Sequence, residues 1–163
     1  MKVDMQISGL TGVLKTLQSL PPEIVSKRGG PVKLALGKGA RFLKDKAKAN
    51  LLVQIAKNGD ESTGLLEKSV ISSRGKAPTD GKGERYLVRV KNKSYNKQGG
   101  EKVTTLKTAN LMEYGSEHQA ATPWLRPAFQ SNARETINLV VDDLKIRIAK
   151  VVDMLSKKNA WVK

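Results

Sequence analysis

The single histidine of the chain lies in a short polar stretch with a serine and a glutamate, Ser116-Glu117-His118. An imidazole, a hydroxyl and a carboxylate can form a nucleophilic site, in which the histidine removes the proton of the hydroxyl. The members of such a site meet in space, and their order in sequence does not predict that geometry. We therefore expect His118 to be an exposed loop residue. Asp142 and Asp143 are a pair of consecutive carboxylates elsewhere in the chain, and we interpret them as part of a solvated helix face.

Other kinds of chemistry have even less support in the sequence. The chain has no cysteine, which excludes disulfides, thiolate metal ligands and thiol nucleophiles, and one histidine cannot make a multi-histidine metal site. Gly29-Gly30 and Gly37-Lys38-Gly39 lack the residues that surround glycines in nucleotide-binding loops. The sequence predicts a protein that is not an enzyme and that uses no cofactor and no metal.

The charge of the chain is strongly positive, with 30 Lys and Arg against 15 Asp and Glu, a net charge of +15 and a pI near 10.1. Such an excess favours an anionic partner, which could be nucleic acid, a membrane surface or an acidic protein. No helix-turn-helix or zinc pattern indicates that DNA sequence is read. Non-specific DNA binding through phosphate contacts is the alternative function, and the cations available for it are Lys44, Lys48, Arg85, Arg89, Lys91, Lys97 and Lys102.

The length of 163 residues suits one domain with one core, spanning residues 1–163. Segments near 26–31, 75–84, 92–103 and 157–163 are rich in turn-forming or charged residues, and we expect them to be flexible. No apolar run approaches the roughly 20 residues of a membrane span, and the first residues lack the apolar centre of a signal peptide. We expect a soluble protein that is made in the cytoplasm and has no membrane partner.

The stretch from Leu111 to Phe129 holds many of the unusual side chains of the sequence. Leu111 to Tyr114 suits a strand, and Gly115 permits the positive φ of a sharp exit from it. A helix then starts either at Pro123, with Thr122 as its cap, or at Pro127. We favour Pro127 as the first helical residue. In a helix that started at Pro123, Pro127 would be the fifth residue, where a proline loses a hydrogen bond at a cost of about 3 kcal/mol. Trp124 and Leu125 would then pack in front of the helix.

The same stretch resembles the signature of a known family. Glu113-Tyr114-Gly115-Ser116, followed by Thr122-Pro123-Trp124-Leu125-Arg126-Pro127-Ala128, is similar to the pattern E-[YF]-G-[ST] … P-[FW]-L-R-P-A. This pattern is found in the tailed-phage family named for gene product ten of the lambdoid phage HK ninety-seven, whose members are tail components or neck and tail-completion proteins. Thr63 to Val70 resembles a second landmark of that family, T-G-x-L-x-x-S-[IV], in the expected order.

The resemblance implies a structural protein of the virion neck, which completes the tail or joins it to the DNA-filled head. Its implied partners are further copies in a ring, with six copies expected, together with head-connector or head-closure proteins and tail-terminator or tail-tube proteins. Virion DNA in the lumen is a further implied partner. We expect the interaction residues to form a rigid elbow that aims the C-terminal helix, with Arg126 paired to Glu113; they are Glu113, Tyr114, Gly115, Pro123, Trp124, Leu125, Arg126 and Pro127.

The remaining elements follow from hydrophobic periodicity. We expect a strand over Lys2 to Ile7, a short amphipathic helix carrying Leu10, Val13, Leu14 and Leu17, and a longer helix from Pro31 towards Lys57 that ends at Asn58-Gly59. Further strands are predicted over 69–74, 85–91 and 108–114, with a hairpin-like loop over 92–102. A helix over 128–156 carries a heptad seam, Ile137, Val141, Leu144, Ile148, Val151 and Leu155. The predicted fold is α+β: a small, mainly antiparallel sheet of three or four strands packed against two longer helices.

Overall fold

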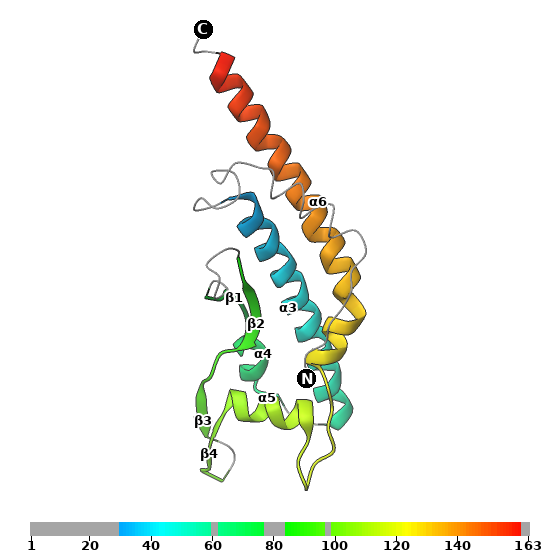
Figure 1. Cartoon of the computed structure of the whole chain (residues 1–163). Helices are drawn as coiled ribbons and strands as arrows, with labels where there is room; N and C mark the ends of the chain where they lie inside the picture. The colour runs from blue at the N-terminus through cyan, green and yellow to red at the C-terminus, as the bar shows by residue number, and fades with distance from the viewer. Residues whose placement is uncertain (1–29, 60–61, 77–83, 97–98, 161–163) are drawn as a thin grey trace.

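The computed structural model of the chain describes residues 30–59, 62–76, 84–96 and 99–160. Two long helices run beside each other, and the strands and a shorter helix gather along one of them and at one end (Figure 1). The fold is α+β, as predicted. Its elements are α3 (Pro31–Asn58), α4 (Leu65–Ser69), β1 (Val70–Arg74), β2 (Tyr86–Val90), β3 (Ser94–Asn96), β4 (Lys102–Thr104), α5 (Thr105–Tyr114) and α6 (Leu125–Ala160).

Helix α3 begins and ends where the sequence indicates. Pro31 occupies the first turn, where a missing N–H does no harm, and Gly59 ends the helix in the left-handed conformation with φ 69°. Gly39 allows α6 to approach closely, since a Cβ atom built on it would lie 2.4 Å from Cγ2 of Val140. Gly37 makes room in the same way for the ring of Tyr86. The two helix-weakening glycines are therefore sites of close packing.

The strands form two separate antiparallel pairs, β1 with β2 and β3 with β4, whereas the sequence predicted one sheet. In the first pair Val70 lies opposite Val90, and Ser72 opposite Val88. These valines pack towards the core, so β1 and β2 cover one side of α3. The second pair overlaps the segment 92–102, which was predicted to be a hairpin-like loop, and its second strand continues to Thr104.

The buried core lies near the end of the molecule where α3, β1, α5 and the start of α6 meet. Trp124 is its largest fully buried side chain, with 1% of its surface exposed. Its members are Ala47, Leu51, Val70, Ala109, Met112, Trp124 and Ala128. Apart from Trp124 these side chains are small or medium-sized, which fits a sequence with few aromatic residues.

The segment predicted as the strand 108–114 belongs to helix α5, so that prediction was wrong. Thr104 caps this helix, since its hydroxyl accepts the backbone N–H of Lys107 at 3.2 Å. Thr105, Ala109 and Met112 then fall at helical spacing and are buried. Burial of this stripe outweighs the strand preference of the bulky residues near Tyr114.

The start of α6 also differs from both predicted registers, because the helix begins at Leu125. Pro127 is its third residue. The first four N–H groups of a helix have no partner within the helix, so a proline there removes no hydrogen bond. Trp124 precedes the helix as expected, whereas Leu125 is part of it.

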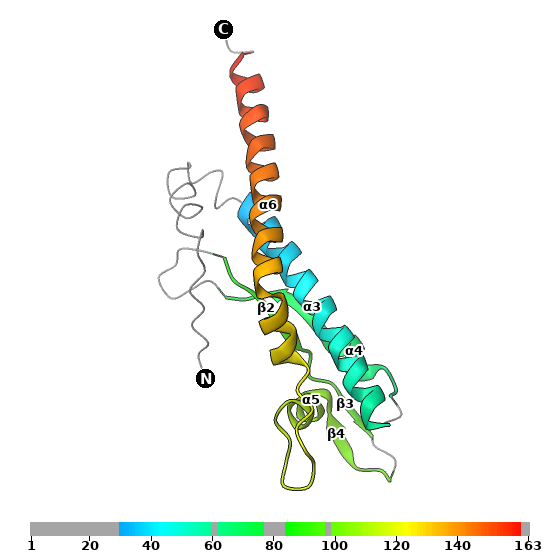
Figure 2. The same ribbon diagram turned by 90° about the vertical axis from the view of Figure 1, so that its right-hand side faces the viewer.

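Helix α6 is longer than predicted and extends past the start of α3, as two perpendicular views show (Figures 1 and 2). Its seam residues Ile137, Val141 and Leu144 face α3 and β2. Three apolar residues outside the seam, Ile146, Val152 and Met154, are exposed by 50 to 60%. The strand over Lys2 to Ile7 and the helix around Leu14 lie outside the described residues. Within the described ranges, no helix combines the length and the apolar character needed to cross a membrane.

Candidate functional site

The elbow is a reversal of the chain between α5 and α6. Gly115 ends α5 with φ 76°, and a Cβ atom there would lie 2.8 Å from backbone atoms of Gln119 and Ala121. The chain then returns, and the N–H of Thr122 donates to the carbonyl of Met112 at 2.7 Å. The start of α6 is thereby placed directly beside the end of α5.

The carboxylate of Glu113 holds the two helices together at this point. One oxygen accepts the backbone N–H groups of Trp124 at 2.9 Å and Leu125 at 2.8 Å, and the other accepts that of Arg126 at 3.1 Å. These are unpaired donors at the N-terminus of α6, where the helix dipole also favours a negative charge. Glu113 therefore caps α6 from a different helix.

Arg126 completes the arrangement on the outer side of the elbow. Its Nε donates to Oε1 of Glu113 at 2.9 Å, and its Nη2 donates to the carbonyl of the same residue at 3.1 Å. The predicted pair is therefore present. The guanidinium also lies over the ring of Tyr114, 5.2 Å from the ring centre. The Arg126 side chain remains 53% exposed, while that of Glu113 is only 5% exposed.

The environment keeps Glu113 ionised. Burial raises the pKa of a carboxyl group, but here the N–H groups of Leu125, Trp124 and Arg126 and the Arg126 guanidinium together lower the pKa below its ordinary value. Burial of a charge is tolerated because each oxygen has two donors. The negative charge at the start of α6 is therefore a fixed feature at neutral pH.

Trp124 connects the elbow to the core. Its indole Nε1 donates to the carbonyl of Ala109 in α5 at 3.4 Å, and its own carbonyl accepts Nδ2 of Asn50 in α3 at 3.4 Å. Leu125 packs against the same core. The sequence indicated that Trp124 would pack before α6, but it did not indicate that one residue would contact α3 and α5 at the same time.

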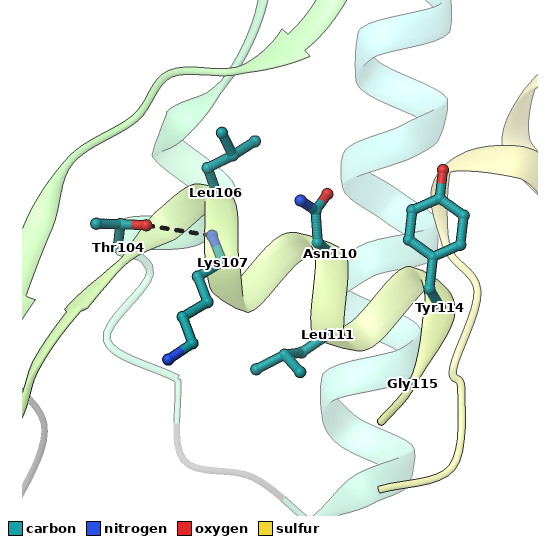
Figure 3. A pocket seen from close by; sticks show the side chains of 7 residues that line it. All are labelled: Thr104, Leu106, Lys107, Asn110, Leu111, Tyr114 and Gly115. Atoms are coloured by element: carbon teal, nitrogen blue, oxygen red, sulfur yellow. Dashed lines mark hydrogen bonds between the residues drawn. The ribbon is translucent and has the colours of Figure 1, made fainter. Parts of the chain in front are cut away.

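The outer side of α5 next to the elbow carries exposed apolar side chains. Leu106 is 41% exposed and Tyr114 is 67% exposed. Together with Lys107 and Asn110 they border a shallow pocket of about 440 Å³ (Figure 3). Because residues 108–114 were predicted to be a strand, sequence reasoning could not place these side chains on one face of a helix.

The residues considered for catalysis do not assemble into a site in the structure. Ser116, Glu117 and His118 are all exposed, as expected for the histidine, and the only described hydrogen bond among them runs from the His118 backbone N–H to the Ser116 hydroxyl at 3.3 Å. No group of three potential metal ligands occurs among the residues that the structure describes.

The interpretation of Asp143 as part of a solvated helix face was wrong, although Asp142 is exposed. The Asp143 carboxylate accepts Nε of Arg147 at 2.5 Å and Nζ of Lys38 in α3 at 2.9 Å. These hydrogen bonds lower the pKa of Asp143 despite its burial. The carboxylate therefore links the two long helices.

The predicted basic surface is distributed over several elements. Lys44 and Lys48 lie on α3, Lys102 lies in β4, and the side chain of Lys97 is outside the described residues. Alternation along β2 places Arg85, Arg89 and Lys91 on the side opposite Tyr86, Val88 and Val90. These three are exposed, and none has a carboxylate within ion-pair distance among the described residues.

Comparison of the chain with protein-family models, with curated proteins and with solved structures found no match.

Proposed function

We propose that this chain is a structural protein of a tailed bacteriophage virion, in which it forms part of a neck or tail-completion ring that joins the tail to the DNA-filled head. The proposal rests on the residues that resemble the phage signature. Glu113, Tyr114 and Gly115 come from one half of the signature and Trp124, Leu125 and Arg126 from the other, and the two halves bind each other in the elbow. The signature residues thus fix the direction of the long helix α6, which is a structural role and not a catalytic one.

The mechanism that we propose is assembly, with no reaction catalysed and no cofactor used. Two groups of exposed apolar residues are available for contacts with adjacent copies or neighbouring rings: Leu106 and Tyr114 beside the elbow, and Ile146, Val152 and Met154 on the free end of α6. A few buried anchor residues supply most of the binding energy in protein interfaces, and tyrosine, the type of Tyr114, is common among them. The net charge of +15 favours neighbours that are acidic, or DNA in the lumen.

The location of the protein tests this proposal. Virions of the phage that encodes the chain would be purified on a density gradient, and an epitope tag on the chain would be detected with gold-labelled antibody by electron microscopy. We expect the protein to remain with the particles and the gold to lie at the junction of head and tail. The proposal fails if the protein is absent from purified virions although the tagged phage is fully infectious.

A second candidate function, non-specific DNA binding, is favoured by the exposed cations Arg85, Arg89 and Lys91 on and beside β2, which form no ion pair with any residue that the structure describes. If each of the three binds one phosphate, the logarithm of the affinity falls with the logarithm of the salt concentration with a slope of about −3. Replacing all three with Gln should then reduce the magnitude of the slope by about 3. Binding that ignores salt would exclude this function.

A further inference from the structure

An apolar groove runs between α3, α6 and β2, and Gly39 is part of its lining. Its volume is about 530 Å³. The charged residues on its border are Glu84 and Arg85 at the β2 side, and most of the remaining lining is aliphatic. The side chains that form its walls include Val32, Leu36 and Leu43 of α3 and Val140, Val141 and Leu144 of α6. A groove with an aliphatic lining suits the apolar face of an amphipathic helix.

We infer that this groove binds the chain's own residues 10–17, by the apolar stripe Leu10, Val13, Leu14 and Leu17. These residues lie outside the described part of the structure, and their spacing is that of one face of a two-turn helix. Leucine and valine side chains on such a face match an aliphatic groove in chemistry. The inference is independent of the proposed role in the virion.

The point at which the chain enters α3 makes this segment a suitable occupant. Gly30 and Pro31 are buried at the start of α3, next to Val32 in the groove wall. Residues 18–29 separate the stripe from Gly30, and an extended linker of that length spans up to about 40 Å. The groove wall from Val32 to Leu43 is only about 16 Å long at the helical rise. The segment can therefore reach every part of the groove.

Charge distinguishes this occupant from a second copy of the chain. Between Ser8 and Leu20 the only charged residue is Lys15, which lies away from the apolar stripe. The free end of α6, by contrast, carries Lys145, Arg147, Lys150 and Lys157 among its exposed apolar residues. Placing that many cations against an aliphatic groove would be opposed by their desolvation.

Disulfide trapping in the full-length chain tests the inference, because the chain has no cysteine of its own. Leu14→Cys is combined in turn with Leu36→Cys, Ile137→Cys and Val141→Cys, and a matched control combines it with Ile146→Cys outside the groove. We expect at least one groove pair to form a bond within a single chain, at a yield independent of protein concentration. Absence of a bond in all three groove pairs, or bonds that join only different chains in mixtures of light and heavy isotope forms, would overturn it.

A second measurement does not depend on the geometry of a disulfide. The single thiol of Val141→Cys is labelled with a maleimide in the full-length chain, in which residues 10–17 should protect it. Adding Leu10→Asp and Leu14→Asp should raise the labelling rate about tenfold by opening the groove. Thr16→Asp, outside the stripe, should leave the rate unchanged. Equal rates in all three proteins would show that this segment does not cover the groove.

Discussion

Replacing Glu113 with Gln should destabilise the protein more than any other single change of charge in the elbow. Glutamine keeps one acceptor oxygen, so at most two of the four hydrogen bonds to the carboxylate survive, and its NH2 group faces backbone donors. Each bond to a charged group is worth about 1.5–3 kcal/mol and the bonds are not additive, so we expect a loss of about 3 kcal/mol. At this chain length the melting temperature should fall by about 10 °C.

The assay for this prediction is urea unfolding at pH 7, followed by circular dichroism, with Glu117→Gln as the matched control. Glu117 is an exposed loop carboxylate a few residues away, and its change should alter the free energy of unfolding by less than about 0.5 kcal/mol. A loss below about 1 kcal/mol for Glu113→Gln, or equal losses for the two variants, would refute the capping role.

The stability that Glu113 contributes should be lost at low pH. Folding lowers the pKa of Glu113, so its contribution is complete above the pKa of the unfolded chain, about 4.3, and is lost as the pH falls through the lower folded value. The difference in stability between the wild-type protein and Glu113→Gln should therefore shrink steadily below about pH 4. A difference that stays constant down to pH 2 would contradict this cause.

Three further predictions concern packing and charge elsewhere. Gly115→Ala should cost about 3 kcal/mol of stability, because φ is positive and the loop backbone blocks the new methyl group. Gly59→Ala, also at positive φ but with open space around it, should cost only about 1–2 kcal/mol. Urea unfolding of both variants measures the difference. Gly39→Ala should cost about 1–3 kcal/mol by overpacking against Val140, and Val140→Ala in the same chain should recover part of that loss in thermal unfolding. Asp143→Asn should cost about 1 kcal/mol at pH 7 because its cationic partners are partly exposed, and this loss should disappear in unfolding curves recorded near pH 2.

Much of the fold follows from local signals in the sequence. Pro31 and Gly59 are strong start and stop signals, and the helix that they delimit is present. The strands β1 and β2 were also predicted, because their patterns are local. Helix α5 was missed because its bulky residues near Tyr114 favour a strand by propensity, although Thr104 provides a local cap.

The site was predictable only in part. The pairing of Glu113 with Arg126 was predicted, but the three backbone N–H groups that the same carboxylate binds were missed. One signal could have indicated them: α6 has no acidic residue in its first turn, and Trp124 before it cannot act as a side-chain acceptor cap. A helix of this length whose own sequence provides no cap requires an acceptor from elsewhere.

Because Glu113 binds backbone N–H groups as well as Arg126, exchanging the two charges is not a valid test of the pair. Exchanging the charges, Glu113→Arg with Arg126→Glu, would place a buried guanidinium against three N–H donors that it cannot satisfy. The exchange should therefore fail to restore stability even though the pair is present. Arg126→Gln alone should cost about 1 kcal/mol or less, since that side chain is half exposed.

The most direct test of the proposed function is electron microscopy of particles from a phage whose copy of this gene carries an early stop codon. We predict DNA-filled heads and separate, complete tails that do not join, and intact virions when the wild-type chain is supplied from a plasmid. Normal, infectious virions without the protein would contradict the proposal, and salt-dependent DNA binding would then be the function to pursue.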